Sequence, residues 1–403
     1  MPDQPLTILC LASYLKGQEF LRECKRQGCR VFLLTSHSLE DADWPHESVD
    51  DFFYMPDVDA KWNLEHTILG VSHLARAQKL DRIVPLDDFD LETAAALREH
   101  LRIPGMGETT TRYFRDKLAM RSRARDRGIL APDFVHVLND DAIRTFIARV
   151  AAPWVLKPRS LAGAIGIKKI SGEGELWQAL EKLGDQRSFY LLEQYIAGDI
   201  YHVDTIVYQR QLLFSNTSRY GVPPMDVTHD GGVFTTRTVP RDSDVSRQLS
   251  DLNWRVLQEF GLVWGVSHSE FILAQADGRQ YFLETSARVG GAHIAELLEA
   301  ATGINMWAEW AKVEIAGEQG AYSAPDPKPG SAGLLVSLAK EEWPDTSAFN
   351  DPEVVWRMKF PWHIGLIVRS ANPQRVEDLL NQYAARVQSE LMASQPAPDK
   401  PTH

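Results

Sequence analysis

The first hundred residues alternate between short apolar runs and amphipathic segments, and this order limits the folds open to the chain. Residues 6–12 (LTILCLA) and 30–35 (RVFLLT) have the composition of buried strands, and residues 17–27 between them have helical spacing. Two consecutive strands that are joined by a helix lie parallel to each other. We therefore expect the chain to begin with a parallel sheet.

The same alternation continues to about residue 101. A predicted helix at 69–80 leads into a predicted strand at 82–86, two aspartates follow, and a second helix is predicted at 91–101. This order predicts a doubly wound α/β domain over residues 1–111. The fingerprint G-x-G-x-x-G does not follow the first strand, so the pattern does not indicate a dinucleotide site.

After residue 134 the pattern changes to short β-type runs with only a few helices between them, which is typical of an α+β fold with antiparallel strands. Asp277-Gly278 is a strong signal for a hairpin turn. A basic helix is predicted at 112–128, and most of its arginines are expected to be solvated. The remaining predicted strands are 154–158, 189–193, 200–208, 211–215, 267–274 and 279–285, and the predicted helices are 140–149, 175–183 and 246–260.

The last part of the sequence predicts a separate small α+β unit. Residues 323–331 (SAPDPKPGS) resemble a linker, and strands at 333–339 and 363–370 precede a helix at 375–391. A disordered tail is expected at 392–403. The predicted domains are residues 1–111, 112–320 with a small lobe at 134–198 and a large lobe at 199–320, and the C-terminal unit at 321–391.

Charge and cysteine content restrict the class of protein. The 403 residues carry a formal net charge of −12, which argues against a general nucleic-acid-binding surface. Three cysteines without paired spacing suit a reducing compartment. The N-terminus lacks a basic region, and no run approaches ~18 apolar residues. We expect a cytoplasmic protein without nucleic-acid or membrane partners.

The segment WVLKPRSLAGAIGI (154–167) has the composition of a phosphate-binding loop. Lys157 stands at the end of an apolar strand, and Ser160, Gly163 and Gly166 follow in the loop. Small residues let backbone N–H groups approach phosphate oxygens, while the ammonium group supplies positive charge. The order of residues is not that of a Walker P-loop, and a hairpin turn with a lysine remains the alternative.

The segment YLLEQYIAGDIYHVD (190–204) has the features of an adenine-binding hinge. An extended segment carries Glu193, then Tyr195-Ile196 and Asp199. Adenine requires a backbone donor, a backbone acceptor and apolar cover, and a later carboxylate can accept from ribose hydroxyls. By itself, however, the segment is more typical of an ordinary strand–turn–strand.

Two glutamates lie on the strands of the predicted hairpin. Pairing about the turn places Phe271 or Ile272 opposite Glu284, with Glu270 one step along. Two neighbouring carboxylates repel each other unless a cation lies between them, and Mg²⁺ prefers such oxygen ligands. Arg288, four residues after Glu284, would alternatively form a helical ion pair with it, but the two glycines that follow disfavour a helix.

These segments occur in an order that resembles the ATP-grasp superfamily, whose members include D-alanine–D-alanine ligase, biotin carboxylase and amino-acid (dipeptide) ligases. The order is Arg115-Asp116-Lys117, a strand with K-P and a glycine-rich loop, E-x-x-x-x-G-D, and a late E…E-x-x-x-R pair. The resemblance spans residues 6 to 315. It implies an N-terminal Rossmann-like sheet, a split α+β ATP-grasp module and a small C-terminal α+β unit.

The resemblance also implies roles for individual residues. Ser286 stands where the family commonly has the asparagine of E-x-N-x-R, which weakens a second metal site. By this resemblance, Lys117 and Lys157 contact the ATP phosphates, the 160–166 loop closes over the β- and γ-phosphates, Glu193 and the Tyr195–Ile196 backbone bind adenine, and Asp199 binds the ribose. Glu270, Glu284 and Ser286 are implied to bind Mg²⁺, with Mn²⁺ as the alternative. Arg288 is implied to bind the transferred phosphoryl group or the substrate carboxylate.

The implied reaction is ligation of an acid to an amine. A carboxylate attacks the γ-phosphate of ATP, and an amine displaces phosphate from the acyl phosphate, which leaves ADP and phosphate. We expect an amino-acid-like acid. The alternatives are a bicarbonate-activating enzyme like biotin carboxylase and a nucleotide-binding protein without turnover.

Further expectations concern the substrates and the assembly. His268 and His293 could orient a substrate, although a structural role is equally consistent with each, and His202 is predicted to pack in the core. Residues 217–234 are predicted to form either a mobile cover or a passive surface loop. A homodimer is expected from the resemblance alone.

Overall fold

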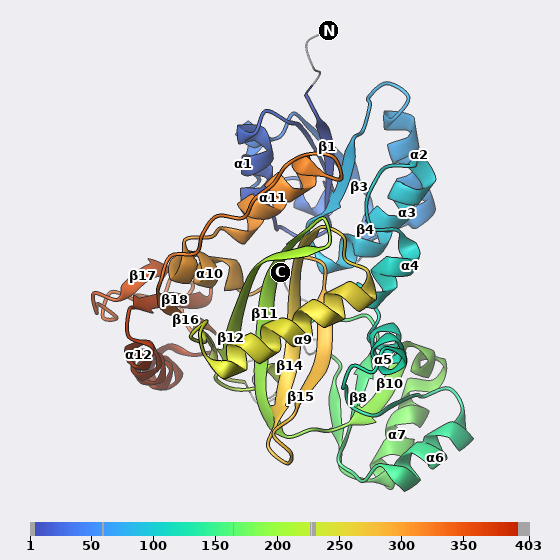
Figure 1. Cartoon of the computed structure of the whole chain (residues 1–403), viewed down its shortest axis with the longest axis vertical. Helices are drawn as coiled ribbons and strands as arrows, with labels where there is room; N and C mark the ends of the chain where they lie inside the picture. Colours follow the sequence, from blue (N-terminus) through green and yellow to red (C-terminus); the bar gives the residue numbers. More distant parts are fainter. Residues whose placement is uncertain (1–4, 59, 164, 226, 228–230, 394–403) are drawn as a thin grey trace.

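The computed structural model of the chain describes residues 5–393, apart from residues 59, 164, 226 and 228–230. Figure 1 shows a parallel sheet at one end of the molecule, a small antiparallel lobe at the other, and a large twisted sheet between them. The prediction of a mixed α/β and α+β architecture is confirmed.

The N-terminal sheet is parallel, as predicted. Its order is β3 (Asp51–Met55), β2 (Arg30–Ser36), β1 (Thr7–Ala12) and β6 (Arg82–Pro85). All six residues of β1 are buried, because α1 (Gln18–Arg26) covers one face and α2 (Leu64–Leu74) and α3 (Leu91–Leu101) cover the other. The prediction of a helix at 69–80 was wrong in its bounds. The side chain of Asn63 caps α2, so the helix begins at Leu64, five residues before the predicted start, and it ends at Leu74.

The basic helix is shorter than predicted and less exposed. A short helix, α4 (Glu108–Thr111), and one 3₁₀ turn precede α5 (Lys117–Asp126). The side chain of Asp116 accepts hydrogen bonds from the amides of Leu118 and Ala119, so the helix begins at Lys117. The expectation of solvated arginines is wrong for Arg115 and Arg121, which are buried.

The small lobe is a four-stranded sheet with two helices on it. Its strand order is β7 (Phe134–His136), β10 (Tyr190–Gln194), β8 (Trp154–Pro158) and β9 (Lys168–Ile170), and its helices are α6 (Asp140–Arg149) and α7 (Glu173–Leu183). Apolar residues of the strands and of both helices form one buried cluster. The lobe therefore has its own core.

The largest sheet has eight strands and extends through the C-terminal unit. Helix α9 (Asp244–Phe260) packs on one face, whereas α10 (Ile294–Thr302) and α11 (Met306–Ala316) pack on the other. Helix α12 (Pro373–Arg386) packs against the C-terminal strands. The strand order is β15 (Gln280–Ser286), β14 (Gly265–Ala274), β11 (Gly198–Tyr208), β12 (Gln211–Tyr220), β13 (Phe234–Thr238), β16 (Ser331–Leu338), β18 (His363–Ser370) and β17 (Val354–Arg357).

Two predicted irregular segments are partly ordered. Of residues 217–234, the first four belong to β12 and Phe234 begins β13, while 226 and 228–230 lie outside the described residues. The backbone of Met392 forms a β-bridge with Ala339, so ordered structure extends past Leu391. The rest of the predicted tail, 394–403, also lies outside the described residues.

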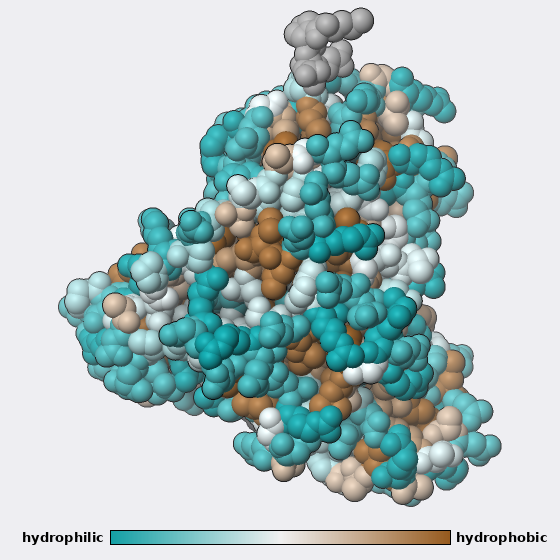
Figure 2. Space-filling model, viewed as in Figure 1, coloured by the Kyte–Doolittle hydropathy of each residue, from teal (hydrophilic) through white to brown (hydrophobic). Residues whose placement is uncertain are grey.

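The surface is largely polar. Figure 2 shows a mostly hydrophilic face on which hydrophobic residues are visible only in small patches. Within the described part of the chain, no helix is both long and apolar enough to cross a bilayer. The three cysteines, Cys10, Cys24 and Cys29, are buried free thiols.

Candidate active site

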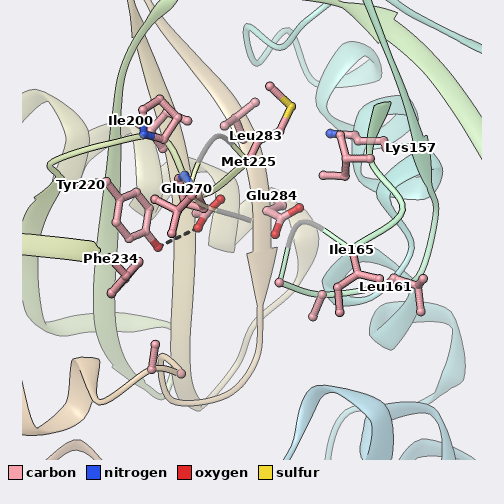
Figure 3. Close-up of a pocket in the computed structure, with 18 of the residues that line it drawn as sticks. Lys157, Leu161, Ile165, Ile200, Tyr220, Met225, Phe234, Glu270, Leu283 and Glu284 are labelled. Carbon is pink, nitrogen blue, oxygen red and sulfur yellow. Dashed lines mark hydrogen bonds between the residues drawn. The ribbon is translucent and has the colours of Figure 1, made fainter. Parts of the chain in front are cut away.

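A cavity of about 610 Å³ opens where the small lobe, the large sheet and the N-terminal unit meet. This volume is typical of a site for a small molecule or cofactor. Figure 3 shows that Lys157, Leu161 and Ile165 of the small lobe face Glu270, Glu284 and Leu283 of the large sheet across it. The cavity therefore brings together residues that are more than a hundred positions apart.

Glu270 and Glu284 lie directly opposite each other on β14 and β15. The sequence-based register placed Glu270 one step away, and the difference is a β-bulge. Phe271 pairs with Phe282 and Glu270 with Glu284, so Leu283 is the extra residue. The bulge brings both carboxylates to the same point of the cavity wall. Carboxylate oxygens are the ligands that Mg²⁺ prefers.

Glu270 is held by two neighbours. Tyr220 on β12 donates a hydrogen bond to its Oε1 at 2.8 Å, and Nε2 of His268 lies 3.8 Å from the same oxygen. Burial opposes the charged form of Glu270, but these two neighbours outweigh that cost and lower its pKa. Glu270 is therefore an anion at neutral pH, although it is buried.

Two buried lysines face the carboxylates. Nζ of Lys117 lies 3.0 Å from Oε2 of Glu284 and 2.7 Å from the carbonyl oxygen of Leu161. Nζ of Lys157 lies 2.5 Å from Oε1 of Glu193. Burial lowers the pKa of Lys157 to about 8, although the charge of Glu193 acts in the opposite direction. Both ammonium groups line the cavity, as expected for phosphate contacts.

Glu193 binds two cations at once. Besides Lys157, it accepts a hydrogen bond from Nε of Arg121 at 3.0 Å. Arg121 and Glu193 are both buried, and Arg121 also donates to the carbonyl oxygen of Leu283. This ion triad fixes Lys157 and connects the small lobe to the strand that bears Glu284.

The glycine-rich loop between β8 and β9 forms part of the cavity wall. Gly163 and its apolar neighbours Leu161 and Ile165 line the cavity, whereas Ser160 and Gly166 do not. Gly163 and Gly166 have φ angles of 70° and 71°, a conformation that favours glycine. The position of Ser160 and Gly166 outside the wall does not support a direct phosphate contact by either residue in this conformation.

The predicted adenine hinge lines the cavity, but the predicted ribose ligand does not. Tyr195 and Ile196 are in the wall, and the ammonium group of Lys169 lies 3.9 Å from the centre of the Tyr195 ring. Asp199 does not line the cavity, so this conformation does not support the predicted contact to the ribose. Since side chains alternate along β11, Asp199 points away from the wall and forms an ion pair with Arg219 at 2.7 Å.

Arg288 follows β15 in a loop and lines the cavity, so it is not part of a helical pair with Glu284. Its guanidinium lies 3.5 Å from Asp88, which also accepts a hydrogen bond from the Ser286 hydroxyl. Nε of Arg288 is buried without a hydrogen-bond partner among the described residues. Arg288 therefore keeps a donor for an anionic ligand, while Ser286 is occupied by Asp88 and lies outside the wall.

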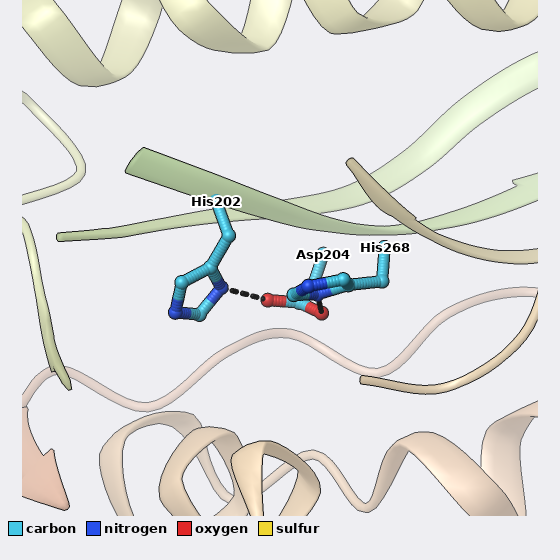
Figure 4. A group of neighbouring side chains, drawn as sticks. All are labelled: His202, Asp204 and His268. Carbon is cyan, nitrogen blue, oxygen red and sulfur yellow. Dashed lines mark hydrogen bonds and ion pairs between the residues drawn. The ribbon is translucent and has the colours of Figure 1, made fainter. Parts of the chain in front are cut away.

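A buried chain of polar groups supports His268. Asp204 accepts hydrogen bonds from His202 and from His268, each at 2.8 Å (Figure 4). Burial disfavours protonation of His268, but Asp204 outweighs burial and raises its pKa to about 9. A Cβ on Gly290 would lie 2.9 Å from Oδ1 of Asp204, so this glycine allows close backbone packing on the pair.

The two predicted substrate histidines therefore differ in position. His268 lines the cavity, and His202 packs in the core as predicted. His293 does not line the cavity, which fits the structural alternative for this residue. It precedes α10, lies 3.2 Å from Glu296, and its ring packs beside Trp356.

Sequence reasoning missed several residues of the site. Tyr220 and Asp204 had no local signal, because their partners are far away in the sequence. Asp88 follows a parallel strand at its carboxyl end, where ligand-binding residues gather, so that signal was available. The missed lining residues also include Tyr14, Lys16, Phe89, Phe234, Val336, Leu338 and His363.

Two curated ligases are similar to this chain in sequence. No model of a known protein family matches the chain. The chain is 26% identical over 234 residues to the L-arginine-specific L-amino acid ligase of Bacillus subtilis, which covers 56% of this chain and 56% of that protein. It is 25% identical over 223 residues to the D-alanine–D-alanine ligase of Ralstonia pickettii, with coverage of 53% and 67%. The alignment thus spans little more than half the length of the first of these relatives.

Solved structures share the fold across the whole chain. The structure of an L-amino acid ligase from Bacillus licheniformis has a TM-score of 0.76 at 19% identity, and the match covers 98% of this chain and 100% of that one. The structure of N5-carboxyaminoimidazole synthetase from Staphylococcus aureus complexed with ADP has a TM-score of 0.71 at 16% identity, with coverage of 95% and 98%.

Proposed function

Since the chain is a member of the ATP-grasp superfamily, we propose that it is an ATP-dependent ligase that joins a carboxylate to an amine through an acyl phosphate and releases ADP and phosphate. One observation carries the proposal. Glu270 and Glu284 lie opposite each other on the wall of a cavity of about 610 Å³ that also holds two buried lysines and Arg288.

The nucleotide would occupy the part of the cavity between the lobes. Lys117 and Lys157 would contact its phosphates, and Tyr195 and Ile196 would contact its base. Bound Mg²⁺, or Mn²⁺ as the alternative, supplies charge neutralisation for phosphoryl transfer. The carboxylates would bind the metal ion and the lysines would bind the phosphates, so the charges of the cavity suit a complex of metal and triphosphate.

The chain's own residues supply positioning and protection from water. Arg288 would donate its unpaired Nε–H to the substrate carboxylate or to the transferred phosphoryl group. Leu161 and Ile165 of the glycine-rich loop, and Phe234 of β13, give the cavity apolar walls. Exclusion of water by such walls protects an acyl phosphate from hydrolysis.

The acid is proposed to be an amino acid. Arg288 lies 3.5 Å from the carboxylate of Asp88. Arg288 lines the cavity and would bind the carboxylate of the substrate, whereas Asp88 orients Arg288 and does not itself line the cavity. The similarity to an L-amino acid ligase and to D-alanine–D-alanine ligase supports an amino acid over the bicarbonate-activating alternative.

The proposal is tested by release of ADP and phosphate from purified protein that is given ATP, Mg²⁺ and pairs of amino acids, with product masses read out. We expect Glu284→Gln to reduce ADP release at least about 100-fold, because a metal carboxylate is lost. Glu259→Gln is the control and should retain activity, because Glu259 is a partly exposed residue near the end of α9, forms an ion pair with Arg127 and does not line the cavity. Full activity of Glu284→Gln would remove the metal role.

The alternatives predict other results in the same assay. ADP release that depends on bicarbonate would favour the biotin-carboxylase-like reaction. ATP binding without ADP release for any acid–amine pair would favour a binding protein without turnover. We also propose a cytoplasmic protein and a homodimer, and analytical ultracentrifugation would test the dimer.

A further inference from the structure

A second cavity, of about 170 Å³, lies behind the candidate active site and shares none of its lining residues. It forms where three parts of the chain meet. The N-terminal unit contributes Pro85 and Arg98, the segment before α4 contributes Met106, and the large lobe contributes Trp264 and Glu314. The chemistry of this cavity is not used by the proposed ligase reaction.

Arg98 reaches this cavity without a carboxylate partner. It is 7% exposed, donates from Nε to the carbonyl oxygen of Ile83 at 2.8 Å, and donates from Nη1 to that of Met106 at 3.3 Å. Among the described residues, no carboxylate forms an ion pair within 4.0 Å of its guanidinium, and both of these hydrogen bonds go to backbone carbonyl oxygens. Burial lowers the pKa of Arg98, although the charge of Glu314 acts against this effect.

Glu314 is the opposite charge in the same cavity. It is 6% exposed, and its two oxygens accept hydrogen bonds from the indole N–H groups of Trp264 at 3.1 Å and Trp310 at 3.0 Å. In the described part of the chain, no cationic nitrogen forms an ion pair with it. A buried charge that lacks a partner is costly, and a ligand of opposite charge relieves that cost.

We propose that this cavity binds a small zwitterion of the amino-acid type, with its carboxylate against Arg98 and its ammonium group against Glu314. Arg98 and Glu314 line one cavity together with the exposed Glu318, and no ion pair within 4.0 Å joins Arg98 to Glu314 among the described residues, so a ligand with both charges can contact both groups. Water alone would solvate each group but would not neutralise either charge.

Size restricts the ligand further. A cavity of about 150 Å³ in another protein holds benzene, which has six heavy atoms. The 170 Å³ available here therefore admits glycine, alanine and acids of similar size. It excludes dipeptides and aromatic amino acids.

The position of the cavity connects a bound ligand to the active site. Ala287, which lines the cavity, is the residue between Ser286 and Arg288. Val266, another lining residue, lies two positions before His268 on β14. A ligand that packs against these residues contacts the backbone on which the active-site side chains are mounted. An effect on turnover follows, and this part of the inference rests on the proposed ligase function.

The test is calorimetric titration of the full chain with alanine in the absence of nucleotide. Thr110→Leu fills the cavity with apolar atoms, and Glu314→Gln removes the negative charge but keeps an acceptor for an indole. Arg288→Gln disables the anion position of the active site instead. We expect binding of alanine to survive in Arg288→Gln and to weaken at least tenfold in Thr110→Leu and in Glu314→Gln.

Matched ligands separate charge from size. Acetate and ethylamine, which each carry one charge, should bind at least tenfold more weakly than alanine, and phenylalanine should not compete. The inference is overturned if no heat of binding is seen, if acetate binds as well as alanine, or if only Arg288→Gln loses binding. If Thr110→Leu does not fold, as judged by its melting curve, Glu314→Gln decides.

The titration measures binding and requires no turnover, so its result remains interpretable even if the ligase assay fails. Conversely, an active ligase whose alanine binding depends only on Arg288 would retain the proposed function and lose the second site. In an active enzyme, saturating glycine should change ADP release from a pair of larger substrates in the wild type and not in Thr110→Leu. An identical response in both proteins would contradict coupling between the cavities.

Discussion

Replacement of Glu193 by glutamine tests whether this carboxylate stabilises the fold by neutralising Lys157 and Arg121. The carboxylate is 3% exposed, and it neutralises both Lys157 at 2.5 Å and Arg121 at 3.0 Å. Glutamine has the same shape but no charge, and its amide nitrogen would face a cation. Glu193→Gln therefore leaves two buried positive groups without a counter-ion.

The expected cost follows from this geometry. Removal of one partner from a buried ion pair typically costs about 3–5 kcal/mol. Here it would take a large share of a total free energy of unfolding that is about 5–15 kcal/mol for typical domains. We expect urea unfolding of the nucleotide-free variant to show a loss of at least about 3 kcal/mol.

Nucleotide should then stabilise the variant more than the wild type, because the phosphates of the bound nucleotide supply the missing negative charge. The comparison of urea midpoints with and without ADP and Mg²⁺ measures this difference. Glu173→Gln is the control, since its nearest cation, Arg144, is 3.7 Å away and both side chains are more than half exposed. A loss below about 1 kcal/mol in Glu193→Gln, or a smaller nucleotide effect than in the wild type, would refute the reasoning.

Three further predictions concern titration and metal binding. Burial lowers the pKa of Lys157 to about 8, so ATP affinity measured by calorimetry should fall as pH rises from 7 to 9, and Lys157→Arg should remove this dependence. Burial, reinforced by the charge of Asp87, raises the pKa of Asp90 from 3.8 to about 7, so the stability that this proton provides is complete below pH 3.8 and is lost as pH rises through 7. Asp90→Asn should abolish that loss, up to about 4 kcal/mol by urea unfolding at pH 8, and an unchanged pH profile would count against it. Tyr220→Phe removes the hydrogen bond that orients Glu270, so the Mg²⁺ concentration needed for half-maximal nucleotide binding should rise about tenfold, and an unchanged requirement would discard this role.

The sequence predicted those strands and helices that are determined by the pattern of apolar residues within the element itself. Strand β1 is buried on both faces and is apolar from Ile8 to Ala12, and the apolar spacing of residues 91–101 predicted α3 with its observed bounds. Helix boundaries failed where a cap decided them, as at Asn63 and Asp116. A cap is one side chain among many of the same kind, so composition alone does not single it out.

In the candidate site, too, some features could be predicted from the sequence and others could not. Glu270, Glu284, Lys117 and Lys157 were found because their order along the chain is characteristic, although their register depended on a bulge at Leu283. The contact between Ser286 and Asp88 joins residues 198 positions apart, and no local pattern encodes it. The position of Asp199 outside the wall follows from alternation along β11, whose neighbouring residues Gly198 and Ile200 line the cavity.

The eight-stranded sheet has a consequence for any attempt to divide this protein. Strand β16 supplies the hydrogen-bonding partner of β13, so a chain cut before Ser331 would expose an open β edge in the middle of the molecule. Such an edge recruits foreign strands and promotes aggregation. A chimaera should therefore take β13 and β16 from the same parent, because the hydrogen bonds between these two strands join the last part of the chain to the rest of the sheet.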